Sequence, residues 1–309
     1  MADSVWKLPA SEELLRPRPL RRLVEPALER RFTYGRYDAF LARLVADPRV
    51  EVLTLRQLAT ADPGRRVLLG LRHDVDDRLD SALRLAELEH RRGVSATYFV
   101  LHTARYYDEH DPRLLEALRQ LQALGHEIGW HNDLVTLQLV YGLDPVEYLG
   151  RELGRLRENG IDVVGTAAHG SIYCHRLGFH NNEFFLDWPK AVPGGRTSRA
   201  RVPVGGEEVE LRRGNLADFG LEYEAYHLGE DRYFSDARFD ERGRRWHPDL
   251  LELGDLRPRE RVVVLVHPCH WDESLGAKYA RVVRRLARRA LRRRVRRRHQ
   301  GARVSRASV

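Results

Sequence analysis

Between residues 67 and 168 the chain alternates short apolar runs with amphipathic stretches. The apolar runs, rich in β-branched and aromatic residues, predict strands at 67–72, 96–101, 127–131 and 163–168. The stretches between them predict helices at 79–92, 111–124 and 144–158, which end at Gly93, Gly125 and Asn159-Gly160. Strands that alternate with helices build βαβ units and a parallel sheet. The pattern therefore predicts an α/β fold, and four units in succession favour a barrel over an open sheet.

Three segments are expected around this pattern. Residues 1–60 form an N-terminal arm, rich in Pro and Arg, that continues into a helix and a short strand packing on the barrel. Residues 61–276 form the barrel, interrupted by an insertion at about 170–220, where Pro193-Gly194-Gly195 and a hairpin break the alternation. Residues 277–309 form a basic amphipathic helix and tail. No glycine-rich phosphate loop follows any predicted strand, which argues against a doubly wound nucleotide-binding fold.

The net charge of +8 comes from the C-terminal segment. Residues 278–309 hold fourteen Lys or Arg and no acidic residue, which leaves 39 basic against 45 acidic residues in the rest of the chain. Eleven arginines between 281 and 298 surround apolar residues at helical spacing, as in helices that bind anionic membrane surfaces. No recognition motif or interleaved aromatic residues favour nucleic acid. A solvated or disordered end is the remaining alternative.

The composition also bears on the compartment. No run of about 18 apolar residues predicts a transmembrane helix, and residues 1–18 do not resemble a signal peptide. Cys174 and Cys269 are the only cysteines, so a disulfide framework is not expected. We therefore expect a cytoplasmic protein, peripheral at the membrane through its tail.

Acidic residues or histidines stand at the end of five predicted strands. Asp74 and Asp76 follow the first strand, His131 ends the third, and His169 follows the fourth. The later strands, predicted near 233–236 and 262–266, end at Asp236 and His267. Because the carboxyl ends of parallel strands meet at one edge or mouth, we expect these side chains to form a site. The simplest alternative is that Asp76 or Asp77 only caps the helix that follows.

Alternation along a strand sorts these residues further. Arg72, Asp74 and Asp76 share one face, whereas His73 and, on the third strand, His126 lie on the opposite face and are assigned structural roles. A carboxylate with two imidazoles suits Zn²⁺ or a similar divalent metal, with an open position for water. A second carboxylate accepts the proton of that water, and a histidine across the site protonates a leaving group. This chemistry predicts hydrolysis of an amide or ester.

Three motifs resemble those of the polysaccharide deacetylase family, the carbohydrate esterases with a nodulation-type deacetylase domain. They are Arg72-His73-Asp74-Val75-Asp76, Gly125-His126-Glu127-Ile128-Gly129-Trp130-His131 and Leu265-Val266-His267-Pro268, with Ala96–Val100 matching the usual second strand. They occur in the family's order and span residues 66–271, and the second motif is the most specific. The resemblance implies a distorted (β/α) barrel and metal-dependent removal of an acyl group from an N-acyl amino sugar.

The resemblance also assigns roles. It implies Asp74 as the general base, Asp76 and His131 as metal ligands, and His267 as the general acid. The chain departs from the family where Val135 replaces a second metal-binding histidine, so His169 is our first choice for the third ligand and Asp133 our second. The arginine-containing third motif is also absent around His169. Asp236, in a segment that resembles divergent members, is expected to orient a catalytic group.

Two further functions compete with this one. A non-catalytic sugar- or membrane-binding relative would explain Val135, but Asp74, Asp76, His131 and His267 are all retained. A hydrolase of another non-peptide C–N bond would keep the same site and change the substrate.

Overall fold

The computed structural model describes residues 32–104, 111–187, 199–204, 206–238, 245–281 and 283–284. The described residues divide into two compact units: a larger one within Tyr37–Cys269, and a smaller one that holds the described residues of 32–36 and 270–284. Most of the predicted basic helix and tail, from residue 285 onward, lies outside the described residues. None of the described helices has an apolar stretch long enough to cross a membrane.

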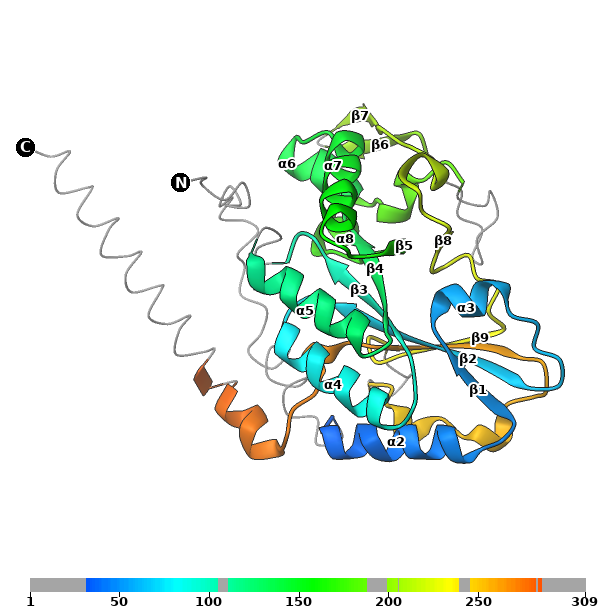
Figure 1. Cartoon of the computed structure of the whole chain (residues 1–309). Helices are drawn as coiled ribbons and strands as arrows, with labels where there is room; N and C mark the ends of the chain where they lie inside the picture. The colour runs from blue at the N-terminus through cyan, green and yellow to red at the C-terminus, as the bar shows by residue number, and fades with distance from the viewer. Residues whose placement is uncertain are drawn as a thin grey trace, which may run out of the picture. The chain divides into compact units, whose positions relative to one another are not determined.

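The larger unit is built on a parallel sheet (Figure 1). Its strands follow the order β8-β5-β4-β3-β2-β10-β9, and β1 pairs with the start of β2. Every pairing in this sheet is parallel. The strands are β1 (Val50–Leu53), β2 (Val67–Val75), β3 (Thr97–Leu101), β4 (Glu127–Asn132), β5 (Val163–Ala168), β8 (Tyr223–Glu224), β9 (Arg232–Ser235) and β10 (Arg261–Val266). The predicted α/β class is confirmed.

Helices connect most of these strands. They are α2 (Tyr34–Ala46), α3 (Leu55–Thr60), α4 (Leu79–Arg91), α5 (Pro112–Ala123), α6 (Leu134–Tyr141), α7 (Pro145–Glu158) and α8 (Ile172–Leu177). Asp-Pro pairs start α5 and α7, because the aspartate side chain accepts a backbone N–H of the first turn and proline fits the first helical position. The region predicted as an insertion holds α8 and a separate antiparallel hairpin of β6 (Arg201–Val204) and β7 (Glu207–Glu210).

The sheet curls around a core on its inner face. Leu68 on β2, Phe99 on β3, Tyr223 on β8 and Val263 on β10 belong to one buried cluster, although β8 and β10 are not neighbours in the sheet. The ring of Tyr226, two residues after β8, also lies 6.1 Å between centroids from the ring of Tyr233 on β9, at the other end of the strand order. The strand order nevertheless ends at β8 and β9, so the sheet is a partly open barrel.

Two strand glycines make room for rings in this interior. A Cβ at Gly129 would lie 2.3 Å from the ring of Phe99, and one at Gly165 would lie 2.3 Å from the ring of Tyr223. The two rings fill the space that the missing side chains leave, so the interior is closely packed.

A buried polar network occupies the outer, helix-covered face. The carboxylate of Glu89 on α4 accepts hydrogen bonds from the hydroxyls of Tyr37 and Tyr98 and lies 2.6 Å from Nε2 of His73. His126 Nδ1 lies 3.6 Å from the same carboxylate. The polar groups are paired, as buried polar atoms must be. His73 and His126 therefore lie on the face away from the strand-end residues, as alternation predicted.

Among the α-helices and strands, the sequence patterns missed α6, α8 and β8. Helix α6 has the sequence LVTLQLVY, which is apolar on nearly all sides and gives no helical period. Helix α8 has six residues and strand β8 only two, too few to show a period. Strand β2 is longer than predicted and carries His73, Asp74 and Val75 within it.

Gly129→Ala should destabilise the protein by about 1–3 kcal/mol, because the methyl group must displace the Phe99 ring in a packed core. Gly150→Ala in α7 is the matched control: a Cβ there meets nothing within 4 Å, and replacing a helical glycine stabilises by about 0.5–1 kcal/mol. Urea unfolding measures both. Equal stabilities of the two variants would contradict this account of the interior.

Candidate active site

The predicted strand-end residues converge at the carboxyl ends of β2, β4 and β5. Ligand atoms of Asp76, His131 and His169 all lie within 4.8 Å of one another. Asp76 comes directly after β2, His131 is on β4, and His169 follows β5. The sheet order places β4 between β3 and β5, so residues distant in the chain meet at one rim. The structure thus brings together the three residues chosen as metal ligands from the sequence.

The orientation of His131 suits a metal ligand. Its Nδ1 lies 2.8 Å from the carbonyl oxygen of Ala167, and a carbonyl only accepts, so Nδ1 carries the proton. The other nitrogen, Nε2, lies 3.4 Å from Asp76 Oδ1 and 3.5 Å from Asp74 Oδ2. A lone pair that faces two carboxylates is favourable only with a proton or a cation between them. One carboxylate and two imidazoles are also a suitable donor set for Zn²⁺.

Asp76 is ionised in this setting. Burial would raise the pKa of its carboxyl, but the neighbouring imidazoles of His131, His169 and His267 outweigh burial and hold the pKa well below its usual range. Its Oδ1 is buried and accepts no hydrogen bond from the described residues. An ionised oxygen without a donor is the second feature that fits a cation.

His169 is supported by a second carboxylate behind it. Its Nδ1 lies 3.5 Å from Asp133 Oδ1. Burial alone would lower the pKa of His169, but Asp133, Asp76 and Asp74 raise it to about 9. Asp133 was our second choice as a ligand. Its oxygens already accept hydrogen bonds of 2.7 Å from Asn181 Nδ2 and Thr103 Oγ1, so the geometry favours His169 over Asp133.

Asp74 is held by an arginine on its own strand. Arg72 donates from Nε and Nη2 to the two oxygens of Asp74, at 2.8 and 2.9 Å. The guanidinium is fully buried, with the rings of Phe99 and Tyr226 at 5.3 and 5.0 Å. Burial would raise the pKa of Asp74, but the charge of Arg72 lowers it. Alternation along β2 predicted that both residues share one face, but no sequence pattern indicated that Arg72 would pair with Asp74.

His267 and Asp236 form a pair opposite Asp76. Asp236 Oδ1 lies 2.5 Å from His267 Nδ1, and Oδ2 accepts the backbone N–H of His267 at 2.9 Å. Burial would lower the pKa of His267, but Asp236, followed by Asp76 and Asp74, raises it to about 9. The other nitrogen, Nε2, lies 4.0 Å from Asp76 Oδ2. Asp236 therefore lies where an orienting partner was predicted, and it touches the predicted general acid.

Glu224 at the end of β8 also supports this rim. It is fully buried and accepts backbone N–H bonds from Ala168 at 3.1 Å and Tyr226 at 2.7 Å. Ala168 precedes His169, and the Tyr226 ring lies on the guanidinium of Arg72. The backbone hydrogen bonds lower the pKa of Glu224, but burial outweighs them and raises this pKa to about 7. The sequence offered no signal for Glu224, since nothing marks the two-residue strand before it.

Other residues considered in the sequence lie elsewhere. Val135, at the position of the missing histidine, is buried in the first turn of α6. The capping alternative for Asp76 or Asp77 is wrong: the N-cap of α4 is Arg78, with a positive φ of 59° and no side-chain cap. Arg78 adopts this left-handed conformation directly before α4 begins.

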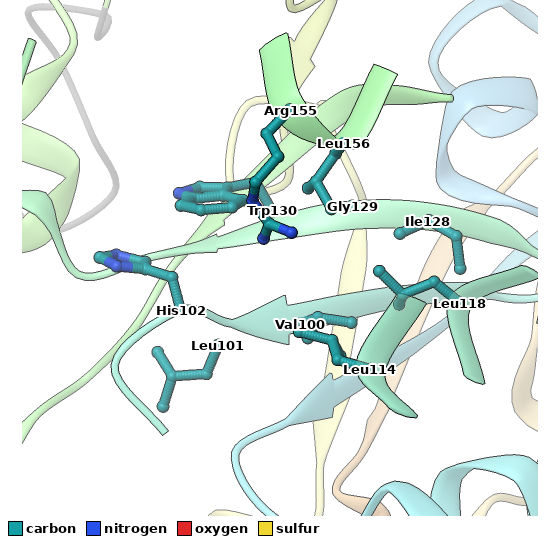
Figure 2. Close-up of a pocket in the computed structure, with 10 residues that line it drawn as sticks. All are labelled: Val100, Leu101, His102, Leu114, Leu118, Ile128, Gly129, Trp130, Arg155 and Leu156. Carbon is teal, nitrogen blue, oxygen red and sulfur yellow. The ribbon is translucent and has the colours of Figure 1, made fainter. Parts of the chain in front are cut away.

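An apolar cavity lies on the other face of the sheet, between β3, β4 and the helices α5 and α7 (Figure 2). Its walls include Val100, Leu114, Ile128 and Leu156, and the Trp130 and His102 rings stack beside it at 4.8 Å. Burial lowers the pKa of His102 to about 3, so this imidazole is neutral. The cavity holds none of the strand-end residues.

Comparison with known proteins gives little further guidance. No family model matches the chain, and no curated protein matches it. A matching solved structure is a mutant of BA3943, described as a CE4 family pseudoenzyme with restored enzymatic activity. The two chains share 14% identity with a TM-score of 0.34, over 74% of this chain and 65% of the other, less than two thirds of its length. At this similarity the site must be judged by its own geometry.

Glu224→Gln should change how stability depends on pH. The pKa of Glu224 is about 7 in the folded protein and about 4.3 in an unfolded chain, so the folded state binds more protons between these values. The protein should therefore lose about 3 kcal/mol of stability through this group as pH rises from 4.5 to 8.

The glutamine variant should lack this component, and urea unfolding at both pH values measures it. All other titrating groups are common to the two proteins, so the difference in slope isolates Glu224. Identical slopes would show that Glu224 titrates normally.

Proposed function

We propose that this protein is a metal-dependent hydrolase that removes an acyl group from the nitrogen of an amino sugar or a glycan intermediate. The meeting of Asp76, His131 and His169, with Asp74 beside them, is the observation that carries the proposal. The sugar substrate rests on the motifs that resemble polysaccharide deacetylases. The metal would be Zn²⁺ or a similar divalent ion, held by these three side chains.

The chain's own residues divide the remaining work. A cation bound by the three ligands supplies an acidified water and polarises the acyl carbonyl. Asp74 is the general base that takes the proton from the attacking water, because Arg72 keeps it ionised and fixed in direction. Arg72 in turn is fixed between two rings.

His267 is the general acid. With a pKa of about 9 it carries a proton at neutral pH, and it can give that proton to the amine nitrogen that leaves. Asp236 binds Nδ1, so the Nε2 proton is the one that faces the site, near Asp76. A base and an acid on two sides of the ligand set are what amide hydrolysis requires.

A non-catalytic sugar-binding relative is the main competing function. Val135 removes one ligand of the family pattern, which favours such a relative. His169 offers an imidazole at the same cluster, which favours the hydrolase. A hydrolase of another non-peptide C–N bond would use the same residues and differ only in substrate.

Asp74→Asn should retain the metal and lower turnover at least 10²-fold, the usual contribution of a general base. His131→Ala should lose both metal and turnover. After Zn²⁺ or Co²⁺ loading, metal content and acetate release from N-acetylglucosamine oligomers are measured for the wild type and both variants.

Glu208→Gln, at an exposed carboxylate of the β6–β7 hairpin, is the control for a changed charge. Substoichiometric metal in the loaded wild type would favour the binding relative. Unchanged turnover in Asp74→Asn would remove Asp74 as the base.

The arginine-rich C-terminal sequence is proposed to hold the enzyme at an anionic membrane, where a lipid-linked or nucleotide-linked sugar would be its substrate. The full chain should sediment with phosphatidylglycerol vesicles and not with phosphatidylcholine vesicles, since each arginine near an anionic surface adds about 1 kcal/mol. A chain ended at residue 276 should stay in the supernatant. Equal sedimentation of the two chains would exclude a role of the tail in membrane binding.

A further inference from the structure

We propose that Asp133 is a positioning residue that turns His169 into the third metal ligand. This proposal rests on the proposed metal site, and it names the residues that would orient a third ligand in the absence of a histidine at position 135. His169 lies just beyond the end of β5, whereas His131 lies within β4. A ligand outside a strand needs other contacts to fix its ring.

The carboxylate of Asp133 is itself immobile. The residue is 3% exposed, and both of its oxygens accept hydrogen bonds: Oδ1 from Asn181 Nδ2 and Oδ2 from Thr103 Oγ1, each at 2.7 Å. Its backbone N–H donates to Nε2 of His102 at 3.0 Å. The neutral imidazole of His102 is a suitable acceptor for that bond. Asp133 is therefore held at its main chain and at both carboxylate oxygens.

Asn181 joins Asp133 to the main chain of His169. Its Nδ2 group also lies 2.8 Å from the carbonyl oxygen of His169, and its Oδ1 accepts the backbone N–H of Thr136 at 3.1 Å. The backbone N–H of His169 donates to the carbonyl of Asn132 at 2.7 Å. The backbone of His169 is thus fixed on both sides, and its ring is the part that remains to be oriented.

The ring faces the fixed carboxylate. Nδ1 of His169 is buried and 3.5 Å from Asp133 Oδ1, longer than a formed hydrogen bond, and it has no other hydrogen-bond partner among the described residues. With the Nδ1 proton directed at Asp133, a cation shared with Asp76 and His131 would take the place of the proton on Nε2. A carboxylate behind a metal-binding histidine fixes the tautomer and makes the imidazole a better donor.

The test is Zn²⁺ affinity, measured by competition with a chromogenic chelator on the full chain, together with the visible spectrum of the Co²⁺ form. Asp133→Asn should weaken Zn²⁺ binding 10–100-fold, as loss of such a partner does, and should alter the Co²⁺ spectrum. Asp162→Asn, at an exposed carboxylate, is the matched control and should change neither. Asp133→Glu should restore part of the affinity.

A double-mutant cycle separates positioning from a general effect on the fold. In a His169→Ala background Asp133→Asn should cause no further loss of affinity, because the ring that it orients is gone. An equal loss in both backgrounds would overturn the proposal. If Asp133→Asn does not fold, Thr103→Val takes its place in the test. This variant removes one hydrogen-bond donor to the Asp133 carboxylate, and we expect a several-fold loss of Zn²⁺ affinity.

The outcomes also distinguish this inference from the proposed function. A wild type that binds no Zn²⁺ would disprove both the proposed hydrolase function and the role of Asp133. The role of Asp133 alone would be disproved by a different result. In that case the wild type binds Zn²⁺, His169→Ala binds it more weakly, and Asp133→Asn is unchanged in affinity and spectrum. Equal affinity of His169→Ala and the wild type would remove His169 as a ligand.

Discussion

The parallel direction of the strands is the constraint on which the site depends. When all strands of a curled sheet run the same way, their carboxyl ends lie at one rim, and whatever residues stand there must share a small volume. In this chain those residues include Asp74, Asp76 and Asp236, each within 4.0 Å of a ring nitrogen of His131 or His267. Asp74 and Asp236 are buried, and such crowding of carboxylates is costly unless each negative charge is compensated.

The compensation is uneven, and this unevenness favours one of the three carboxylates as a ligand of the proposed cation. Asp74 has a guanidinium on both oxygens, and Asp236 has the ring and the backbone N–H of His267. Asp76 has only imidazole nitrogens nearby, at 3.4 and 4.0 Å, and a buried oxygen without a donor among the described residues. The least compensated carboxylate is therefore the one that stands between His131 and His169. Such a position suits a ligand, while the fully paired Asp74 suits a base.

Sequence alone was sufficient for the parts of this arrangement that depend on period and direction. The strand and helix pattern predicted the parallel sheet, and alternation put Arg72 with Asp74 and separated His73 and His126 from them. Contacts between residues far apart in the chain could not be predicted from the sequence. Glu224 binds Ala168, and Asn181 binds Asp133, through loops whose paths no local pattern reveals. Helix α6 escaped because a helix apolar on most sides has no period to detect.

The three proposed ligand positions differ in how much support the fold gives them. His131 lies inside a strand, and one hydrogen bond from its ring to the neighbouring strand fixes its tautomer. His169 lies in the loop that follows β5, and a loop fixes the position of a side chain less precisely than a strand does. The contacts around it are correspondingly denser: its main-chain N–H and C=O are both bonded, and a carboxylate with two donors of its own lies behind the ring. Buried polar side chains are thus concentrated around His169, the proposed ligand that the secondary structure supports least. Burying them has a free-energy cost, and this cost is expected where a ring must be held in one orientation for a cation.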